Sequence, residues 1–221
     1  MKRNALQRNL FGVLLSLIFT ASMVSAAPTV PIATATADIE NAAPGRNETA
    51  WGRLVSDALR SAGKTDLALV NAGSLNPGTL TAGTISQSQI DALLSFPNDD
   101  VVILPVTGAA LRSAVELSLR AYPTNSPAFL QGSGWEGAFN PQASAGKRLT
   151  SLKINGQNIS PNSTYQVAMP ISLAQGTNGY FAYWNDSSAR SLKTTIAAAV
   201  ANYLAEKRVV SPENGARLKA Q

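Results

Sequence analysis

Two short patterns in this 221-residue sequence have residue types and spacing that could do chemistry. Asp99 and Asp100 could act as a pair of carboxylates, but adjacent residues just before a strand project to opposite faces, which favours a solvated turn. Gly132-x-Gly134-x-x-Gly137 has the glycine spacing of a dinucleotide-binding loop. That loop requires an amphipathic helix directly after it, whereas Phe139-Asn140-Pro141 indicates extended chain. Neither pattern therefore identifies an active site.

The residue types that are missing restrict the chemistry further. The sequence contains no histidine and no cysteine. This excludes Ser-His-Asp and Cys-His nucleophiles, histidine-containing zinc sites and an imidazole general base. A metal site would need oxygen ligands alone, which favours Mg²⁺ or Ca²⁺, and the sequence has no EF-hand loop. We therefore expect no catalytic residue, no metal site and no cofactor in this chain.

The elements that would position a binding site alternate between helices and strands. Apolar residues spaced three to four apart predict helices over 49–62, 86–94 and 107–119. Ser86 with Gln89 three residues on is a capping box that predicts the start of the second helix. An Ala-rich run predicts a closing helix over 194–207. Apolar runs predict strands over 67–70, 101–106 and 165–169, and Asn155-Gly156 predicts a hairpin between 149–154 and 157–159. Residues 176–180 are predicted to form a loop. Because crossover and hairpin connections are mixed, we expect an α+β (mixed α/β) fold, a single layered domain with mixed sheets and flanking helices.

The first 26 residues have the three parts of a secretory signal. Lys2, Arg3 and Arg8 precede an apolar run over 10–19, and Val24-Ser25-Ala26 places small residues at the expected cleavage positions. An uncleaved membrane anchor is the alternative, but the run is shorter than the roughly 18 to 20 residues that span a bilayer. We therefore expect a periplasmic or extracellular protein, with no membrane attachment after cleavage.

Composition indicates a globular protein without a strongly charged partner. Hydrophobic residues make up 45% of the sequence and charged residues 14%. The net charge of +5 would fall to about +2 once the signal is removed, which is too small to indicate nucleic acid or an anionic membrane as a partner. Residues 27–47 are rich in Ala, Thr and Pro and are predicted to be an extended lead-in outside the core. Residues 48–221 are predicted to form the domain.

Eight short motifs follow one another in order between residues 48 and 184. They lie at 48–58, 66–75, 82–86, 94–98, 106–111, 129–134, 167–168 and 176–180. Among them are Asn71-Ala72-Gly73-Ser74, Leu94-x-Phe96-x-Asn98, Phe129-Leu130-Gln131-x-Ser133-Gly134 and Gly176-x-Asn178-Gly179-Tyr180. In this order and spacing they resemble the C-terminal, substrate-binding domain of the 5′-nucleotidase family.

The resemblance implies a nucleoside pocket without catalytic groups. In that family a separate N-terminal domain holds two metal ions and performs hydrolysis, while two aromatic rings of the C-terminal domain sandwich the base. The resemblance assigns those rings to Phe129 and Tyr180 and places Asn71 close to the base. Stacking uses the π-face that every base has, so it gives affinity with little selectivity. The alternative for both rings is ordinary packing in the core.

The sequence departs from the family where phosphate is bound. Asn76 replaces the arginine that grips the substrate phosphate, and Asn47 replaces a second arginine. Arg46, one residue away, could substitute only if its loop shifts, because an amide cannot reproduce a bidentate guanidinium. Asn178 stands at the acidic position of the last motif, and Asp186 could still meet a ribose hydroxyl. The resemblance therefore implies a pocket suited to a base and poor in phosphate contacts.

The sequence is compatible with three functions. We favour a binding domain for a nucleoside or nucleotide-like small molecule that is not catalytic by itself. The second is half of a split 5′-nucleotidase, completed by a separate metallophosphoesterase domain. The third is a structural or interaction domain whose ancestral pocket has decayed.

Overall fold

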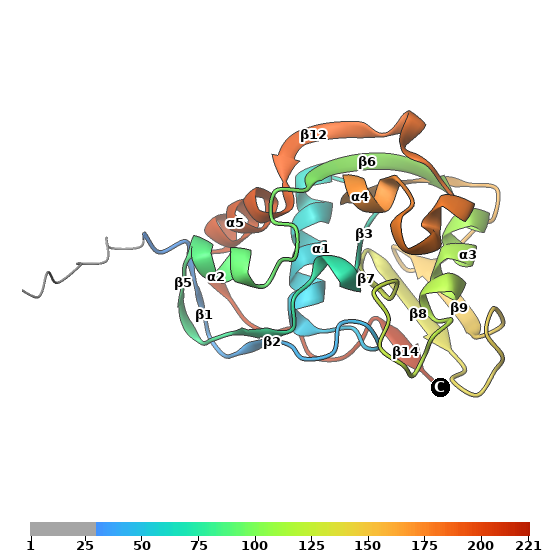
Figure 1. The fold of residues 1–221 in the computed structure, drawn as a ribbon, viewed down its shortest axis with the longest axis horizontal. Helices are drawn as coiled ribbons and strands as arrows, with labels where there is room; N and C mark the ends of the chain where they lie inside the picture. The colour runs from blue at the N-terminus through green and yellow to red at the C-terminus, as the bar shows by residue number, and fades with distance from the viewer. Residues whose placement is uncertain (1–29) are drawn as a thin grey trace, which may run out of the picture.

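A five-stranded mixed sheet forms the centre of the structure, a computed structural model that describes residues 30–221. Its strand order is β12 (Arg190–Thr195), β6 (Asp100–Thr107), β11 (Thr164–Pro170), β3 (Leu67–Asn71) and β7 (Leu130–Ser133). The pair β11–β3 is parallel and the other pairs are antiparallel. With helices on both faces of this sheet (Figure 1), the predicted α+β class is confirmed. The predicted signal segment lies outside the described residues.

Alternating side chains along the central strands build a hydrophobic core on each face of the sheet. In β3, Ala68 and Val70 belong to one cluster, whereas Leu67 and Leu69 belong to the other. Successive residues of a strand point to opposite faces, so a strand that is apolar throughout must be covered on both sides. The continuous apolar runs in the sequence are explained by this double burial.

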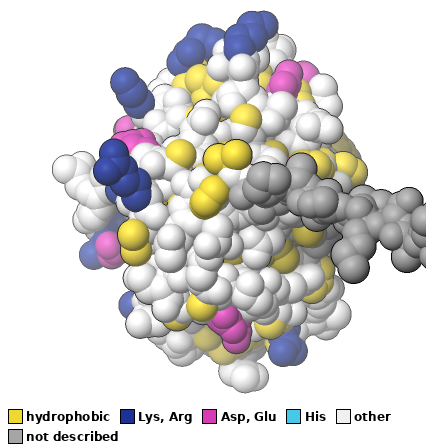
Figure 2. All heavy atoms as spheres, turned by 90° about the vertical axis from the view of Figure 1, so that its left-hand side faces the viewer, with side chains coloured by type: hydrophobic (Ala, Val, Ile, Leu, Met, Phe, Trp, Pro, Cys, Tyr) yellow, Lys and Arg dark blue, Asp and Glu magenta, His cyan; other side chains and the backbone are white. Residues whose placement is uncertain are grey.

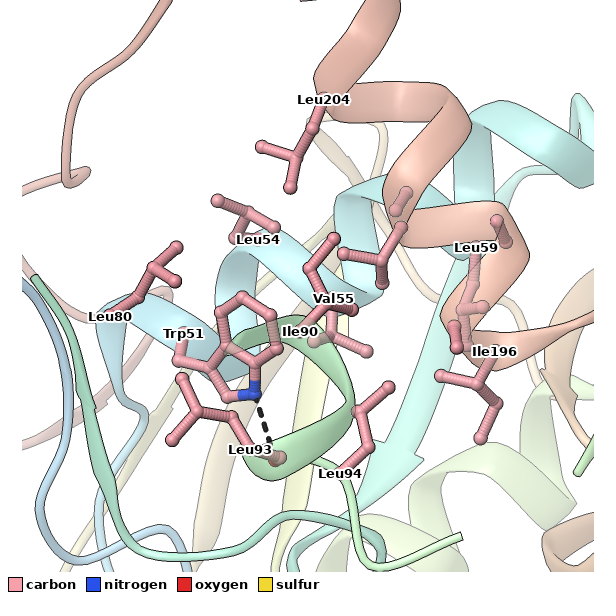
Figure 3. Packing of buried hydrophobic residues seen from close by; sticks show 14 of the residues in the cluster. Trp51, Leu54, Val55, Leu59, Leu80, Ile90, Leu93, Leu94, Ile196 and Leu204 are labelled. Carbon is pink, nitrogen blue, oxygen red and sulfur yellow. Dashed lines mark hydrogen bonds between the residues drawn. The ribbon is translucent and has the colours of Figure 1, made fainter. Parts of the chain in front are cut away.

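Helices α1 (Ala50–Gly63), α2 (Gln87–Ala92) and α5 (Ile196–Lys207) cover one face. Trp51 is fully buried among leucine and isoleucine side chains of these helices, of β4 and of the residues that follow α2 (Figure 3). Its indole N–H donates to the Leu93 carbonyl at 3.1 Å. The predicted capping box at Ser86 and Gln89 is confirmed, and the Thr49 hydroxyl caps α1 by accepting from the Gly52 N–H at 2.9 Å.

Helix α3 (Gly108–Ser118) and a second sheet cover the other face. The order of that sheet is β10 (Gln157–Asn158), β9 (Leu149–Ile154), β8 (Trp135–Phe139) and β14 (Leu218–Ala220). The Asn155-Gly156 hairpin is confirmed, with Gln157 paired to Ile154. Figure 1 shows α3, β8 and β9 together on the opposite side of the central sheet from α5.

The predicted position of residues 27–47 outside the core is wrong for Ala33 to Asn41. Strand β1 (Ala33–Ala35) pairs with β5 (Gly83–Ile85) and β13 (Val209–Val210), and β2 (Ile39–Asn41) pairs with β4 (Gly78–Leu80). Ile39 is completely buried in the cluster around α1. The strands that pair with β1 and β2 are distant in the sequence, so a local excess of Ala, Thr and Pro could not reveal this burial.

The surface on the side of α2, α5 and β1 carries few charges in its middle. Figure 2 shows Lys, Arg, Asp and Glu side chains mainly around the rim of this face and largely neutral surface between them. The part of this face that the described residues form therefore has no continuous basic surface of the kind that binds nucleic acid. Within residues 30–221, no helix combines the length and the apolar character needed to cross a bilayer.

Candidate functional site

A surface cavity of about 700 Å³ lies where the end of β3 meets three other segments. One wall is the short helix η1 (Ala72–Ser74) with Asn71, and another is the turn over residues 95–99. Pro127, helix α4 (Ile171–Ala174) and the turn η2 (Thr177–Ala182) complete the lining. Chain segments far apart in the sequence thus meet at one edge of the central sheet.

The turn over residues 95–99 is held at both ends by backbone hydrogen bonds. The Ser95 N–H donates to the Ser74 carbonyl at 3.0 Å, and the Asp99 N–H closes the turn on the Phe96 carbonyl at 3.1 Å. The Ile196 N–H donates to the Asp99 carbonyl at 2.9 Å. Phe96 lines the cavity from this turn and is 58% exposed. An aromatic face on a rigid turn, open to solvent, is a platform on which a flat ring can stack.

Two amide side chains converge on one carbonyl beside the cavity. The Nδ2 of Asn71 donates to the Pro127 carbonyl at 3.2 Å, and the Nδ2 of Asn178 approaches the same oxygen at 3.4 Å. The Oδ1 of Asn71 accepts from the Ser74 hydroxyl at 3.0 Å. Each amide retains an N–H and at least one lone pair. Asn178 is exposed and can both donate to and accept from a ligand, whereas Asn71 is 2% exposed and presents only a small part of its amide to the cavity. Both predicted residues line the cavity.

Asp99 supplies the charge in the cavity. Its Oδ2 accepts a hydrogen bond of 2.6 Å from the Ser172 hydroxyl, and both side chains are half-buried. Among the described residues that line the cavity, Asp99 alone is charged. Of the two residues predicted to lie in a solvated turn, Asp100 is exposed at the start of β6 and Asp99 is half-buried at the cavity.

The structure contradicts the predicted placement of Phe129 and Tyr180 on opposite walls of a cleft. Phe129 is 2% exposed and Tyr180 is fully buried, and both belong to the cluster between the central sheet and α3. Neither ring lines the cavity. The alternative interpretation, ordinary core packing, describes both rings.

Tyr180 is held in the core by polar and aromatic contacts. Its hydroxyl donates to the Ala128 carbonyl at 2.6 Å, and its ring stacks on Trp184 with centroids 5.1 Å apart and an interplanar angle of 5°. Burial raises the pKa of the Tyr180 phenol well above its ordinary value. Tyr180 thus anchors the η2 turn in the core. Asn178, two residues earlier in the same turn, lines the cavity, whereas Tyr180 does not.

The other predicted contacts lie outside the cavity. Arg46 is exposed in the loop that precedes α1. The neighbouring Gly45 carbonyl accepts from the N–H of Ser126 at 2.9 Å, and Ser126 directly precedes Pro127. Asp186 begins the short helix η3 (Asp186–Ser188) and does not line the cavity.

Asn76, at the position of the family's arginine, points inward. It donates to the Ala92 carbonyl at 3.0 Å and the Leu94 carbonyl at 3.2 Å, and it accepts from the Ser95 hydroxyl at 2.8 Å. This amide therefore fixes the turn that carries Phe96.

Sequence reasoning missed Phe96 and Asp99 as cavity residues. The motif Leu94-x-Phe96-x-Asn98 contributed to the resemblance, but no role was assigned to its aromatic ring. A signal was available, because a phenylalanine between Ser95 and Pro97-Asn98 stands in turn-forming sequence, where a large apolar side chain is unusual. Within residues 30–221, no group of three or more potential metal-ligating side chains comes together.

The fold is shared with larger solved proteins. A 5′-nucleotidase precursor from Thermus thermophilus has a TM-score of 0.78 at 24% identity, covering 86% of this chain and 39% of that chain. The NAD nucleotidase of Haemophilus influenzae has a TM-score of 0.74 at 16% identity, covering 87% and 38%. At these identities the likeness shows the fold alone.

The family follows from the sequence comparisons. The family model for the 5′-nucleotidase C-terminal domain matches residues 31–184, so this chain belongs to that family. The 5′-nucleotidase of Diplobatis ommata is 28% identical over 138 residues, 59% of this chain. The chain spans only 24% of the length of that relative. The match begins at residue 31 and thus includes β1 and β2, in agreement with their burial.

Proposed function

We propose that this protein is an exported domain that binds nucleosides or nucleotide-like small molecules and does not hydrolyse nucleotides by itself. The observation that carries the proposal is Phe96, an exposed aromatic ring fixed at a cavity beside the amides of Asn71 and Asn178. A base needs a π-face to stack on and paired donors and acceptors at its edge, and these three side chains offer both. A cavity of about 700 Å³ is within the size range of small-molecule sites.

The absence of hydrolysis by this chain alone is supported by its residue types. Phosphate-ester hydrolysis by two metal ions needs a cluster of ligands. The sequence has no histidine, and residues 30–221 contain no cluster of metal-ligating side chains. Export rests on the signal pattern over residues 1–26.

A titration of the purified protein with nucleosides tests the binding proposal. Calorimetry with adenosine, uridine and guanosine should give saturable binding to one site, and the same ligands should raise the melting temperature. Ribose alone should not bind, because it has no base to stack on Phe96. If no nucleoside binds at millimolar concentration, the domain is a structural relative of the family and the binding function is wrong.

A phosphate-release assay tests the second part. The purified protein should release no phosphate from adenosine monophosphate with Mg²⁺, Mn²⁺, Zn²⁺ or Ca²⁺. Release that appears only when a separate metallophosphoesterase domain is added would instead support the split-enzyme alternative. Release by the pure protein that disappears when its own carboxylates are substituted would overturn the proposal.

A further inference from the structure

The charge of the cavity is negative and fixed in position. Asp99 is the one charged side chain among the described lining residues. Its backbone is held by Phe96 and Ile196, and its Oδ2 accepts from the Ser172 hydroxyl at 2.6 Å. An ionised carboxylate only accepts hydrogen bonds, so the remaining lone pairs of Asp99 can interact with a ligand only as acceptors.

Within the described residues, no cation is paired with this carboxylate. The ion pairs there join Arg53 and Arg217 to Glu213 and Asp57, on the other part of the molecule around the C-terminal segment. Asn76 has its amide turned inward to two backbone carbonyls, so that position supplies neither charge nor a free donor to the cavity. Asp99 is therefore the one formal charge that the described lining residues bring to the cavity.

We propose that Asp99 makes this site select neutral ligands that carry hydroxyl donors, such as nucleosides, and reject their phosphorylated forms. This inference rests on the proposed binding function and adds the charge class of the ligand. A cavity of 700 Å³ is equivalent to a sphere about 11 Å across, so a phosphate on a ligand bound there lies at most about 11 Å from Asp99, a distance comparable with the Debye length of about 8 Å in 0.15 M salt. Like charges at such a separation repel, while ribose hydroxyls donate to the carboxylate.

If the site had only lost its phosphate-binding arginines, the relative affinities for a nucleoside and its monophosphate would differ from those that repulsion by Asp99 predicts. Without a cation in the cavity and without Asp99, a nucleoside and its monophosphate would bind equally, since the phosphate would be neither attracted nor repelled. Repulsion by Asp99 instead predicts that adenosine binds at least about tenfold tighter than adenosine monophosphate at low salt. Because a screened charge acts more weakly, the preference should shrink between about 0.05 M and 0.5 M NaCl.

The decisive variant is Asp99→Asn, with Asp100→Asn as its matched control. Asparagine keeps the shape of the side chain and an oxygen that accepts from Ser172, and melting curves report whether the fold is intact. We expect Asp99→Asn to bring the affinity ratio of adenosine to its monophosphate close to one. Asp100→Asn changes the same charge one residue away on an exposed side chain and should keep the wild-type ratio.

The outcomes separate the two levels of the proposal. If wild-type protein binds the monophosphate as tightly as adenosine, or if Asp99→Asn keeps a tenfold preference, the role of Asp99 is overturned while binding of nucleosides stands. If the wild type binds neither compound, the proposed function fails and the inference fails with it. A wild-type preference that does not change with salt would also overturn the electrostatic mechanism.

Discussion

Phe96 is an apolar ring that is 58% exposed in a molecule whose other tryptophan, tyrosine and phenylalanine side chains mostly serve the core. Its turn is held by Ser95, Asn76 and the start of α5, so the ring is presented on a rigid support. Exposure of a large ring at a cavity leaves apolar surface in water unless a ligand covers it. Among single residues, Phe96 is therefore the side chain on which affinity for the proposed nucleoside ligand should depend most.

Phe96→Ala should weaken nucleoside binding by about ten- to a hundredfold, since stacking of a base on one ring contributes roughly 1–3 kcal/mol. Phe181→Ala is the matched control, because Phe181 is 75% exposed in the neighbouring η2 turn but does not line the cavity. Calorimetric titration of both variants measures the difference. Equal losses in the two variants, or none in Phe96→Ala, would show that the base does not stack on Phe96.

Glu48 is the first residue of the first family motif, and its side chain has a structural role. Its Oε2 accepts from the backbone N–H groups of Arg217 and Leu218, and its Oε1 accepts from the Trp135 indole at 3.1 Å. Burial raises the pKa of the Glu48 carboxyl above its ordinary value of 4.5, although these hydrogen bonds oppose the shift. The residue thus joins the C-terminal strand β14 to the start of the domain.

Glu48→Gln should lower the free energy of unfolding by about 1–3 kcal/mol, because an amide offers one oxygen to three donors. The pKa shift adds a pH dependence. A folded-state pKa above the unfolded value contributes stability below about pH 4.5 and loses it as pH rises through the folded pKa. The difference in free energy of unfolding between wild type and Glu48→Gln should therefore be larger at about pH 4.5 than at about pH 7.

Denaturant unfolding at both pH values measures this gap, and Glu136→Gln on the exposed side of β8 is the control. Glu136→Gln should change stability by less than about 0.5 kcal/mol. A gap that narrows as the pH falls would mean that the hydrogen bonds outweigh burial and that the Glu48 pKa is lowered.

At the scale of elements, several motif residues hold loops and helices in register. Gln131 in β7 is completely buried, accepts from the Thr49 N–H at 2.9 Å, and donates to the Pro44 and Asn47 carbonyls at 2.8 Å each. A Cβ on Gly52 would lie 2.3 Å from the Gln131 oxygen, so glycine is required there for α1 to approach β7. These contacts fix the path of residues 43–49 into the first helix.

The strands before α1 belong to the same arrangement. Ile39 in β2 is fully buried against α1 and β4. Ile39→Ala should lower the free energy of unfolding by about 2–5 kcal/mol, the usual loss when a buried isoleucine leaves a cavity. Val30→Ala, at a position that is 82% exposed, should have almost no effect. Thermal melts compare the stabilities of the two variants. Similar melting temperatures would show that β2 lies outside the cooperative core.

At the scale of the whole molecule, one sheet separates two hydrophobic clusters. Val167 and Met169 of β11 lie in one cluster and Ala168 lies in the other. The C-terminal segment adds a further link, because β13 pairs with β1 while β14 pairs with β8 in a different sheet. Arg217 strengthens this segment through two hydrogen bonds of 2.9 Å to the Asp57 carboxylate.

Because β3, β6 and β11 each supply side chains to both clusters, the two clusters should unfold together. We expect a single transition, with circular dichroism and tryptophan fluorescence giving the same midpoint. Limited proteolysis should cleave near the ends of the chain and in surface loops without releasing two stable fragments. Two separated transitions, or a persistent fragment ending near residue 125, would show that the faces of the sheet fold independently.

The sequence by itself determined the features that depend on neighbouring residues. The spacing of apolar residues located α1 and α3, the capping box located α2, an Ala-rich run located α5, and Asn155-Gly156 located the hairpin. Each of these signals lies within one or two turns of chain of its structural consequence. The ordered motifs also identified the family, since a series of short matches in register carries information that no single match has.

Only the tertiary structure decided which side chains face the cavity. Phe96, Phe129 and Tyr180 are all aromatic residues within family motifs, yet Phe96 alone of the three lines the cavity. Asp99 faces Ser172, 73 residues away, and Asn76 turns toward the backbone of α2 and the following turn. The side of the backbone on which a side chain lies depends on the register and packing of distant segments, and no local pattern in the sequence records those contacts.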